Sequence, residues 1–428
     1  MEHAVPVSSS RQPGFHQLSP RERLDKIIDT DAGIKDSLLD LGTNDQTLMD
    51  LADGMIENAV GVMQVPLGIA PNFLIDGQEY LVPMAIEEPS VVAAASKMAL
   101  IARKHGGFTT STDDPIMIGQ IQIVETSDPY AARLRLLEAR NELLTLANAQ
   151  DPVLVRVGGG ARNIEVRILP LNDGDCLVLH LLVDVKDAMG ANAVNTMVEA
   201  LAPRVAVIAE GRSLLRILSN RADRRLARAR ATFDAAELGG KEVVADMVAG
   251  CNLAIADPYR AATHNKGIMN GISAVVLATG NDTRAVEAGA HSYAVIDGRY
   301  TSLSHFEQNE DGNLVATLEL PMAVGLVGGA TSTHPVARAT VRLLGVSTAR
   351  ELASVIVAVG LAQNVGALRA LASEGIQRGH MALHARNVAI AAGAQRDEID
   401  AITKRLIAEG QVRRDRAEDI LEELRRPE

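Results

Sequence analysis

Aromatic residues and cysteines are scarce in this chain of 428 residues. Tryptophan is absent and aromatic residues make up 2 % of the total, so stacking platforms for single-stranded nucleic acid are not expected. The two cysteines, Cys176 and Cys251, exclude a disulfide framework and fit a reducing compartment. We expect Cys176 to pack in a core strand and Cys251 in a helix, and neither to be a nucleophile.

Long apolar runs and an excess of basic charge are missing as well. The longest uncharged stretch, 320–337, is interrupted by glycines and prolines, so no membrane span is expected. Lysine and arginine number 42 against 54 aspartate and glutamate residues, which argues against a general nucleic-acid binder. The N-terminal residues do not resemble a secretion signal. With 47 % apolar residues the chain can bury a large core, and we expect a cytoplasmic enzyme.

Residues 116–219 have the pattern of a separable unit. Alternating or apolar runs predict four strands, at 116–124, 163–169, 176–185 and 213–219. Helical spacing predicts helices at 129–150 and 190–209. The resulting order, β-α-β-β-α-β, is that of a ferredoxin-like domain.

The flanking segments predict mixed α/β structure and an amphipathic tail. A strand at 78–84 runs into a helix that we expect Pro89 to open. Residues 220–375 contain helical segments rich in alanine and glycine. From Arg396 onward, mixed charges accompany apolar residues at helical spacing. This tail is either a pair of solvated surface helices or a mobile cap over a site.

The densest group of polar residues lies in DPYRAATHNKGIMNG, at 257–271. The group consists of Arg260, His264, Asn265, Lys266 and Asn270, beside glycines that favour loops. Guanidinium and ammonium groups suit carboxylates and phosphates, so the segment predicts an anion pocket. An ordinary surface loop is the alternative.

Two carboxylate positions could serve such a pocket. The apolar run at 275–278 predicts a strand, and Asp282 lies near its expected carboxyl end, where α/β proteins place functional groups. Asp282 either holds the charge of Lys266 or caps the following helix. Glu87 and Glu88 lie at a strand-to-helix turn. Apolar neighbours there would suit general acid–base work, and helix capping is again the alternative.

Two further motifs have several readings. The segment DAMGAN, 187–192, precedes a predicted helix whose N-terminal N–H groups can bind phosphate, and turn geometry is the alternative. His380 and His384 share a helix face. They could begin a zinc site, pack in the structure, or supply a proton. No third ligand and no HExxH motif is present, so we expect no metal.

Eight segments together resemble 3-hydroxy-3-methylglutaryl-coenzyme A (HMG-CoA) reductase, in particular its soluble bacterial class II form. They are ENAVG (57–61), EEPSVVAAAS (87–96), GGFTTS (106–111), DAMGANAVNTM (187–197), DPYRAATHNKGIMNG (257–271), ATGNDTRAVEAGAH (278–291), AVGLVGGATSTHP (323–335) and GLAQN…EGIQRGHMALHARN (360–387). The likeness runs from about Pro13 to the C-terminus.

The resemblance implies an α/β (α+β) fold: a large mixed domain, an inserted ferredoxin-like βαββαβ cofactor domain and a helical C-terminal flap. The implied boundaries are 1–112 and 220–375 for the large domain, 113–219 for the inserted NAD-binding domain and 376–428 for the flap. It also implies a homodimer, or a higher oligomer built of dimers, with sites at the subunit interface. The cap interpretation of the tail is therefore preferred.

The implied reaction reduces HMG-CoA through mevaldyl-CoA and mevaldehyde to mevalonate and CoA, using two nicotinamide cofactors, and it also runs in reverse. Motif matching assigns catalytic roles to Glu88, Lys266, Asp282 and His380. Lys266 would stabilise negative charge on oxygen, and Asp282 would hold Lys266. Glu88 would act as general acid or base at the aldehyde stage, and His380 would protonate the CoA thiolate.

The resemblance also implies binding residues. Ser90, Arg260 and Asn270 would contact the HMG part. The dinucleotide would be bound by Asp187, Met189, Gly190 and Asn192. Asp151 matches the acidic residue that bonds the adenosine ribose in NAD-preferring relatives, and it would repel a 2′-phosphate. We therefore expect NAD(H) over NADP(H), as in mevalonate-degrading relatives, with mevalonate synthesis as the alternative. The alternatives are another acyl-CoA enzyme, such as a hydrolase or lyase, and a non-enzymatic CoA- or nucleotide-binding protein.

Overall fold

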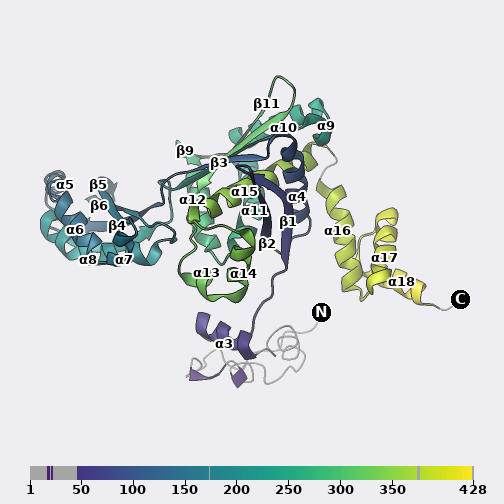
Figure 1. Cartoon of the computed structure of the whole chain (residues 1–428), viewed down its shortest axis with the longest axis horizontal. Helices are drawn as coiled ribbons and strands as arrows, with labels where there is room; N and C mark the ends of the chain where they lie inside the picture. The colour runs from purple at the N-terminus through teal and green to yellow at the C-terminus, as the bar shows by residue number, and fades with distance from the viewer. Residues whose placement is uncertain (1–16, 20, 23–45, 173, 374–375, 427–428) are drawn as a thin grey trace. The chain divides into compact units, whose positions relative to one another are not determined.

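The structure is a computed structural model that describes residues 17–19, 21–22, 46–172, 174–373 and 376–426 (Figure 1). The chain divides into two units, 1–66 and 67–428, and each is described by itself. In the first unit the structure describes helix α3 (Gln46–Met55). All other helices and strands named below belong to the second unit.

A six-stranded sheet forms the centre of the second unit. In spatial order its strands are β11 (Ser304–Gln308), β12 (Leu314–Pro321), β8 (Leu226–Phe233), β3 (Phe108–Thr112), β1 (Leu67–Ile75) and β2 (Gln78–Ala85). The pair β1–β3 is parallel and the other neighbours are antiparallel. Strand β2 confirms the predicted strand at 78–84. Because β3 pairs with β8, the chain leaves this sheet after β3 and returns to it more than 100 residues later.

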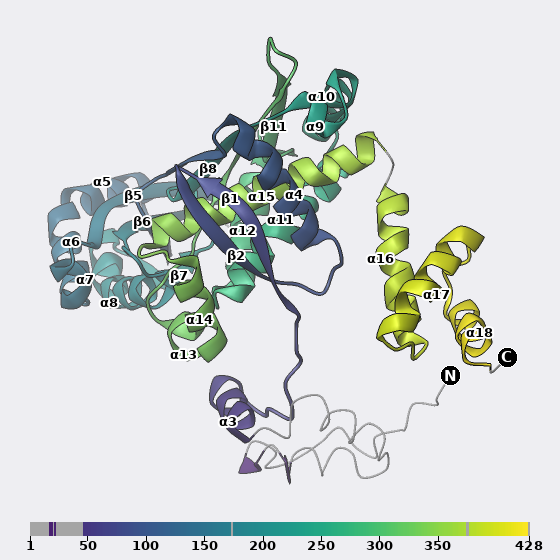
Figure 2. The ribbon, with the colours of Figure 1, turned by 45° about the vertical axis from the view of Figure 1, so that its right-hand side comes forward.

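Apolar helices cover this sheet and complete its core. They include α4 (Val91–Ala102), α10 (Lys241–Ala256), α11 (Pro258–Ala278) and α15 (Ala349–Ala372). Helix α15 packs on α4, α11 and the strands β3, β8 and β12, and Figure 2 shows it running along the sheet. By length and composition α15 could cross a membrane, but 67 % of its apolar window is buried, which is typical of a core helix.

Shorter elements complete the large part of the unit. They are η3 (Arg103–His105), α9 (Ala235–Leu238), α12 (Thr283–Tyr293), β9 (Val295–Ile296), β10 (Arg299–Tyr300), α13 (Gly329–Thr333) and α14 (Pro335–Leu344). Cys251 is fully buried in α10, as predicted, and Cys176 is buried in a strand of the second sheet.

Between β3 and β8 the chain builds a second, four-stranded sheet with its own apolar core. The elements in chain order are β4 (Ile116–Val124), α5 (Pro129–Glu138), α6 (Arg140–Asn148), α7 (Pro152–Arg156), β5 (Gly160–Leu171), β6 (Gly174–Asp184), α8 (Ala191–Ala209) and β7 (Arg212–Ser219). The antiparallel order β5-β6-β4-β7 confirms the predicted ferredoxin-like topology. The exact domain boundaries stay a prediction.

Three details differ from the sequence-based expectations. The predicted helix 129–150 is two helices, α5 and α6, which meet at Ala139. Helix α4 begins at Val91 rather than at Pro89, because Ser90 has a left-handed backbone with φ of 74°. The predicted strand at 275–278 is wrong: these residues are the last turn of α11. Their apolar run reflects a helix buried in the core, which periodicity over four residues does not distinguish from a strand.

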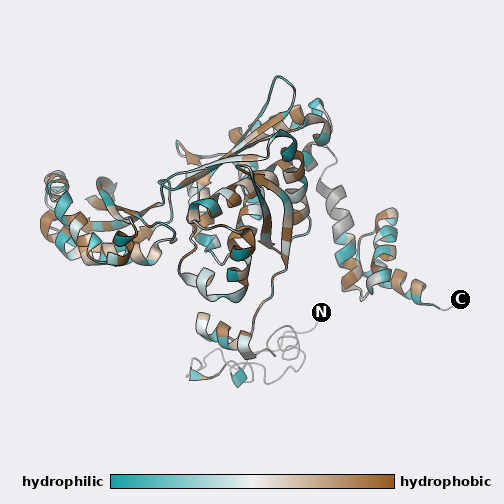
Figure 3. Cartoon of the chain, in the orientation of Figure 1, coloured by the Kyte–Doolittle hydropathy of each residue, from teal (hydrophilic) through white to brown (hydrophobic). Residues whose placement is uncertain are grey.

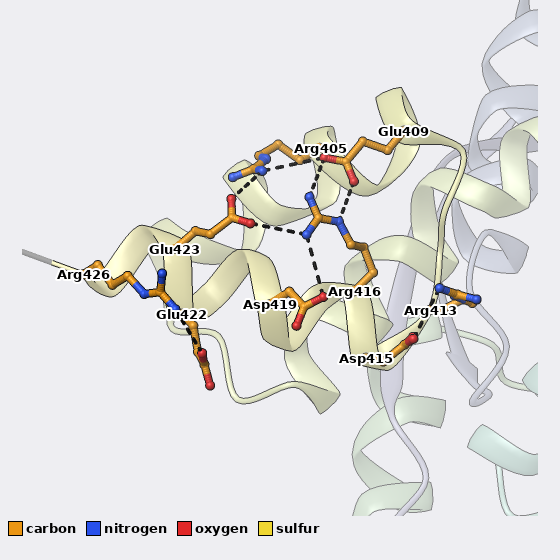
Figure 4. Close-up of polar contacts among 9 residues, drawn as sticks. All are labelled: Arg405, Glu409, Arg413, Asp415, Arg416, Asp419, Glu422, Glu423 and Arg426. Atoms are coloured by element: carbon orange, nitrogen blue, oxygen red, sulfur yellow. Dashed lines mark hydrogen bonds and ion pairs between the residues drawn. The ribbon is translucent and has the colours of Figure 1, made fainter.

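The tail forms a three-helix group from α16 (Ile376–Ala391), α17 (Arg396–Glu409) and α18 (Arg414–Arg425). Its small core includes Ile402, Leu406 and Ile420, in line with the predicted amphipathic faces. In Figure 3 hydrophilic and apolar residues alternate around α17 and α18. Ion pairs join α17 to α18: Arg405 lies 2.7 Å from Glu423, and Arg416 bonds both Glu409 and Glu423 (Figure 4). These ion pairs add to the apolar core that joins the two helices, and the capping role stays a prediction.

Candidate active site

The side chains of Lys266 and Asn270 both contact one carboxylate oxygen of Glu88. Lys266 Nζ lies 3.1 Å from Glu88 Oε2, and Asn270 Nδ2 donates to the same oxygen at 3.3 Å. Lys266 and Asn270 are four residues apart on α11 and so share a face, whereas Glu88 lies in the turn between β2 and α4. The Lys266 side chain is 63 % exposed and that of Glu88 33 %. The fold therefore unites two motifs that are far apart in the sequence.

The polar segment 257–271 forms the cap and the first part of helix α11, so the alternative of an ordinary surface loop is wrong. Asp257 caps α11, because its carboxylate accepts hydrogen bonds from the N–H groups of Tyr259 and Arg260, and Pro258 takes the first helical position. The glycine at 271 allows close helix packing: a Cβ there would lie 2.9 Å from Gln363 Cβ of α15. This glycine therefore serves the contact between two helices and does not form a loop.

His264 and Asn265 anchor α11 in the core. The prediction that they line an anion pocket is therefore wrong for these two residues. Asn265 is fully buried and bonds the Thr301 carbonyl at 2.8 Å and the Leu303 N–H at 3.0 Å. His264 Nε2 lies 2.7 Å from Ser304 Oγ. These contacts fix the rotation of α11 and thereby present Lys266 and its neighbours on the opposite, exposed side.

The buried imidazole of His264 predicts a loss of stability in acid. Burial, with a smaller effect of the Arg260 charge, lowers its pKa from 6.5 to about 4. As the pH falls through this window the unfolded chain binds a proton that the folded protein excludes, so stability decreases, by up to about 3 kcal/mol at pH 4. Urea unfolding at pH 7 and pH 4.5 should show a smaller difference for His264→Gln than for the unchanged protein. An equal pH dependence would contradict this.

Asp282 caps α12, and capping was one of the two roles predicted for it. Its carboxylate accepts from the N–H groups of Arg284 and Ala285 and pairs with the Arg284 guanidinium at 3.1 Å. Partial burial raises the pKa of Asp282, but the Arg284 guanidinium and these N–H groups outweigh it, so the pKa lies below its usual value.

Within one chain the structure joins Asp282 to Arg284 and not to Lys266. The N–H of Asn281 bonds the Val276 carbonyl, which lies ten residues, or about 15 Å, beyond Lys266 along the helix. Both side chains are described, and no hydrogen bond or ion pair connects them. The expectation that Asp282 holds Lys266 is therefore not met inside a single chain.

The DAMGAN residues gather at the N-terminus of α8. Gly190 has φ of 105°, and a Cβ there would lie 2.6 Å from Val185 Cγ1, so this turn requires glycine. Met189 is half-buried and Asn192 is exposed. The Asp187 carboxylate instead accepts the N–H of Ala349, at the start of α15, at 2.8 Å. Asp187 thus ties the turn to the large part of the unit.

The remaining predicted residues occupy separate positions. Asp151 caps α7, accepting the Leu154 N–H at 2.9 Å. Ser90 precedes α4, and its side chain makes no capping hydrogen bond. Arg260 lies six residues, about 9 Å, before Lys266 on α11.

His380 lies in α16, but its side chain is outside the described residues. His384, four residues later, is exposed. Among the described residues there is no group of three His, Cys, Asp or Glu side chains that could hold a metal ion.

A cavity of about 590 Å³ lies elsewhere, against the exposed face of the large sheet. Its lining includes Thr109, Arg228, Thr317 and Glu319 and contains none of the predicted site residues. We place the candidate site where Lys266 and Asn270 of α11 meet Glu88, because residues singled out in the sequence come together there. The cavity holds the Arg228–Glu319 ion pair but none of those residues.

Comparison with known proteins agrees with this geometry. Residues 19–385 match the family model described as hydroxymethylglutaryl-coenzyme A reductase. The chain belongs to this family. The 3-hydroxy-3-methylglutaryl-coenzyme A reductase of Archaeoglobus fulgidus is 55 % identical over 417 residues, which cover 97 % of this chain and 95 % of that protein. The resemblance seen in the sequence motifs is confirmed.

Solved structures of HMG-CoA reductases share the fold. A Streptococcus pneumoniae enzyme is 42 % identical, with a TM-score of 0.76, and the match covers 96 % of this chain and 99 % of that chain. A class II enzyme from the same organism, described as bound to NADPH in open conformations, is 41 % identical with a TM-score of 0.74 over 95 % and 99 % of the two chains. The predicted mixed α/β fold is therefore that of class II HMG-CoA reductases.

Proposed function

We propose that this HMG-CoA reductase interconverts HMG-CoA and mevalonate plus CoA with NAD(H), through mevaldyl-CoA and mevaldehyde. The observation that carries the proposal is the contact of Lys266 and Asn270, on α11, with Glu88 of the β2–α4 turn. This site combines a cation, an amide and a carboxylate within hydrogen-bond reach, which suits stabilising and protonating an oxygen atom that becomes negative.

Each catalytic residue has a role that its chemistry supports. The dinucleotide, when bound, supplies the hydride. The Lys266 ammonium stabilises the carbonyl oxygen of the thioester, and later of the aldehyde, as it gains negative charge. Glu88, 3.1 Å from that ammonium, exchanges a proton at the aldehyde stage. His380 gives a proton to the departing CoA thiolate, and Arg260 and Ser90 bind the HMG part.

We propose that the site is completed by a second copy of the chain. Asp282 has Arg284 as its partner within its own chain, about 15 Å along α11 from Lys266. In a symmetric dimer, Asp282 of one copy can approach Lys266 of the other, because a two-fold interface brings different residues of the same surface together. A homodimer in the cytoplasm is therefore the proposed working form.

The N-terminal end of α8 fits a dinucleotide. Gly190 leaves the first N–H groups of this helix without a side-chain cap, and the helix dipole there favours phosphate. Met189, Asn192 and Gly190 would line this position. Asp187 would act by holding the turn against α15, since its carboxylate is bound there.

The choice between NAD(H) and NADP(H) is assigned to Asp151. A pneumococcal relative is described as bound to NADPH, so the fold is compatible with the phosphorylated cofactor. A carboxylate at 151 would repel the 2′-phosphate. We therefore propose NADH preference, which suits mevalonate degradation.

Replacing Asp151 by asparagine should raise kcat/KM for NADPH relative to NADH by about tenfold, because it removes one repulsive charge. Asparagine keeps an oxygen for the cap on α7, so helix stability changes little. Steady-state kinetics with both cofactors measure the ratio. Asp128→Asn is the matched control. The Asp128 carboxylate also accepts a main-chain N–H at a helix N-terminus, that of α5, which packs with the same four-stranded sheet. Unchanged selectivity in Asp151→Asn would contradict the assignment.

His380→Gln should impair steps that involve CoA and spare the reduction of free mevaldehyde, because only the former need a protonated thiolate. We expect kcat with HMG-CoA to fall by about 10²-fold or more. The two substrates are compared under the same conditions. Equal losses with both would show that His380 does not serve the thiolate.

The whole proposal is tested by one assay. Purified protein, mevalonate, CoA and either NAD⁺ or NADP⁺ are mixed, and absorbance of the reduced nicotinamide is followed. We expect CoA-dependent reduction of NAD⁺ to exceed that of NADP⁺. In the opposite direction, with HMG-CoA and NADH supplied, thioester cleavage without oxidation of NADH would favour a hydrolase instead.

A further inference from the structure

Arg225 is a buried arginine with main-chain partners. It lies where the chain returns from β7 to β8, and only 5 % of its surface is exposed. Its NH1 group donates to the carbonyl oxygens of Ala188 and Met189 at 3.1 and 3.3 Å, and NH2 donates to that of Val324. Among the described residues, no hydrogen bond or ion pair joins this guanidinium to a carboxylate. Burial lowers the pKa of Arg225 to about 10, against the opposing effect of the Asp187 and Asp184 charges.

Burying a charged guanidinium costs desolvation free energy, so the contacts that it makes must stabilise the fold enough to offset that cost. A buried guanidinium without a carboxylate contact depends on the carbonyl dipoles around it and, for Arg225, on the more distant charges of Asp187 and Asp184. Arg228, three residues later, shows the common solution: it is half-exposed and pairs with Asp113 and Glu319. What distinguishes Arg225 is the identity of its three carbonyl partners, two of which belong to the turn before α8.

The two carbonyls determine where the N–H groups of this turn point. A peptide unit is planar and its C=O and N–H are opposed. When the carbonyls of Ala188 and Met189 face Arg225, the N–H groups of the same two units, on Met189 and Gly190, face away from it. The guanidinium therefore sets the orientation of two donors directly before the first turn of α8.

The third carbonyl connects this turn to the catalytic segment. Val324 is followed by Gly325, whose N–H donates to Asn281 Oδ1 at 2.7 Å, and Asn281 precedes Asp282. A Cβ on Gly325 would lie 2.4 Å from the Met189 nitrogen, so the two segments are in direct contact. Arg225 thus binds both the turn before α8 and the segment that holds the Asn281–Asp282 turn.

We propose that Arg225 is a positioning residue that orients the Met189 and Gly190 N–H groups for the pyrophosphate of the dinucleotide and fixes this turn to the Asn281–Asp282 turn. The proposal rests on the proposed function, because that function assigns the dinucleotide to the start of α8. It concerns a residue that touches neither substrate nor cofactor.

The test compares Arg225→Met and Arg225→Lys with the unchanged protein. Dissociation constants for NADH are measured by nicotinamide fluorescence, and KM is measured for NADH and for HMG-CoA. Arg225→Met should weaken NADH binding and raise its KM by about tenfold or more, because the donors lose their orientation, with KM for HMG-CoA within about twofold. Arg225→Lys should restore part of the affinity, since an ammonium can serve some of the three carbonyls.

Two further variants keep the test decisive. Arg204→Met removes an exposed arginine of α8 that pairs with Glu142 far from the helix start, and it should leave NADH binding unchanged. Gly325→Ala forces a Cβ against the Met189 nitrogen and should weaken NADH binding in the same way if Arg225→Met does not fold.

The outcomes separate this proposal from the proposed function. If the unchanged protein binds no NADH, the proposed function fails first. If it binds NADH and Arg225→Met binds equally well, or if affinities for NADH and HMG-CoA fall together in Arg225→Lys and Gly325→Ala, the positioning role is refuted.

Discussion

Lys266→Ala should lower kcat for both reductive steps by about 10³-fold, whether HMG-CoA or free mevaldehyde is the substrate. Each step places negative charge on a carbonyl oxygen, and removing the group that stabilises such an oxygen costs about 10² to 10³ in rate. The side chain is 63 % exposed, so its removal leaves the core intact. NADH consumption with each substrate is the measurement, and unfolding curves confirm that the fold is retained.

Lys104→Ala is the matched control. Lys104 also forms an exposed ion pair, with Glu237 at 2.6 Å, and belongs to a helical turn next to the same sheet. Loss of such a pair is worth about 1 kcal/mol or less and should not alter the rate. If Lys266→Ala keeps near-normal NADH oxidation, or if Lys104→Ala loses as much, Lys266 is not the group that stabilises the oxygen.

Much of the fold follows from short-range patterns in the sequence. The ferredoxin-like order could be predicted because β4, β5, β6 and β7 carry strong strand patterns and α8 a strong helical one. The break at Ala139 and the start of α4 at Val91 could not, since each depends on the backbone conformation of a single residue.

The candidate site shows a different limit of sequence reasoning. The residue types predicted acid–base chemistry at 88 and an anion pocket at 266 and 270, but their meeting depends on the packing of α11 beside the β2–α4 turn. His264 looked like a pocket residue because polar side chains usually face solvent. Its burial and its bond to Ser304 show that it faces the core. No sequence motif pointed to Arg225. Its partners are main-chain carbonyl groups, which every residue has, so the sequence around it carries no signal.

The shared site makes a sharp prediction about mixtures of inactive variants. Lys266→Ala and Asp282→Asn should each be nearly inactive alone, and asparagine retains an oxygen to cap α12. If Lys266 of one copy works with Asp282 of the other, a mixed dimer contains one intact site and one doubly altered site. Random mixing by co-expression or by unfolding and refolding should then restore about a quarter of normal activity.

The control mixture uses two residues that already meet within one chain. Glu88 and Lys266 are 3.1 Å apart in the same copy, so a mixed dimer of Lys266→Ala and Glu88→Gln has one defect in each site and no intact site. This mixture should stay inactive. Recovery in the control, or none with Asp282→Asn, would contradict a site divided between copies. Asp282 would then have to reach Lys266 within its own chain, against the distance imposed by α11.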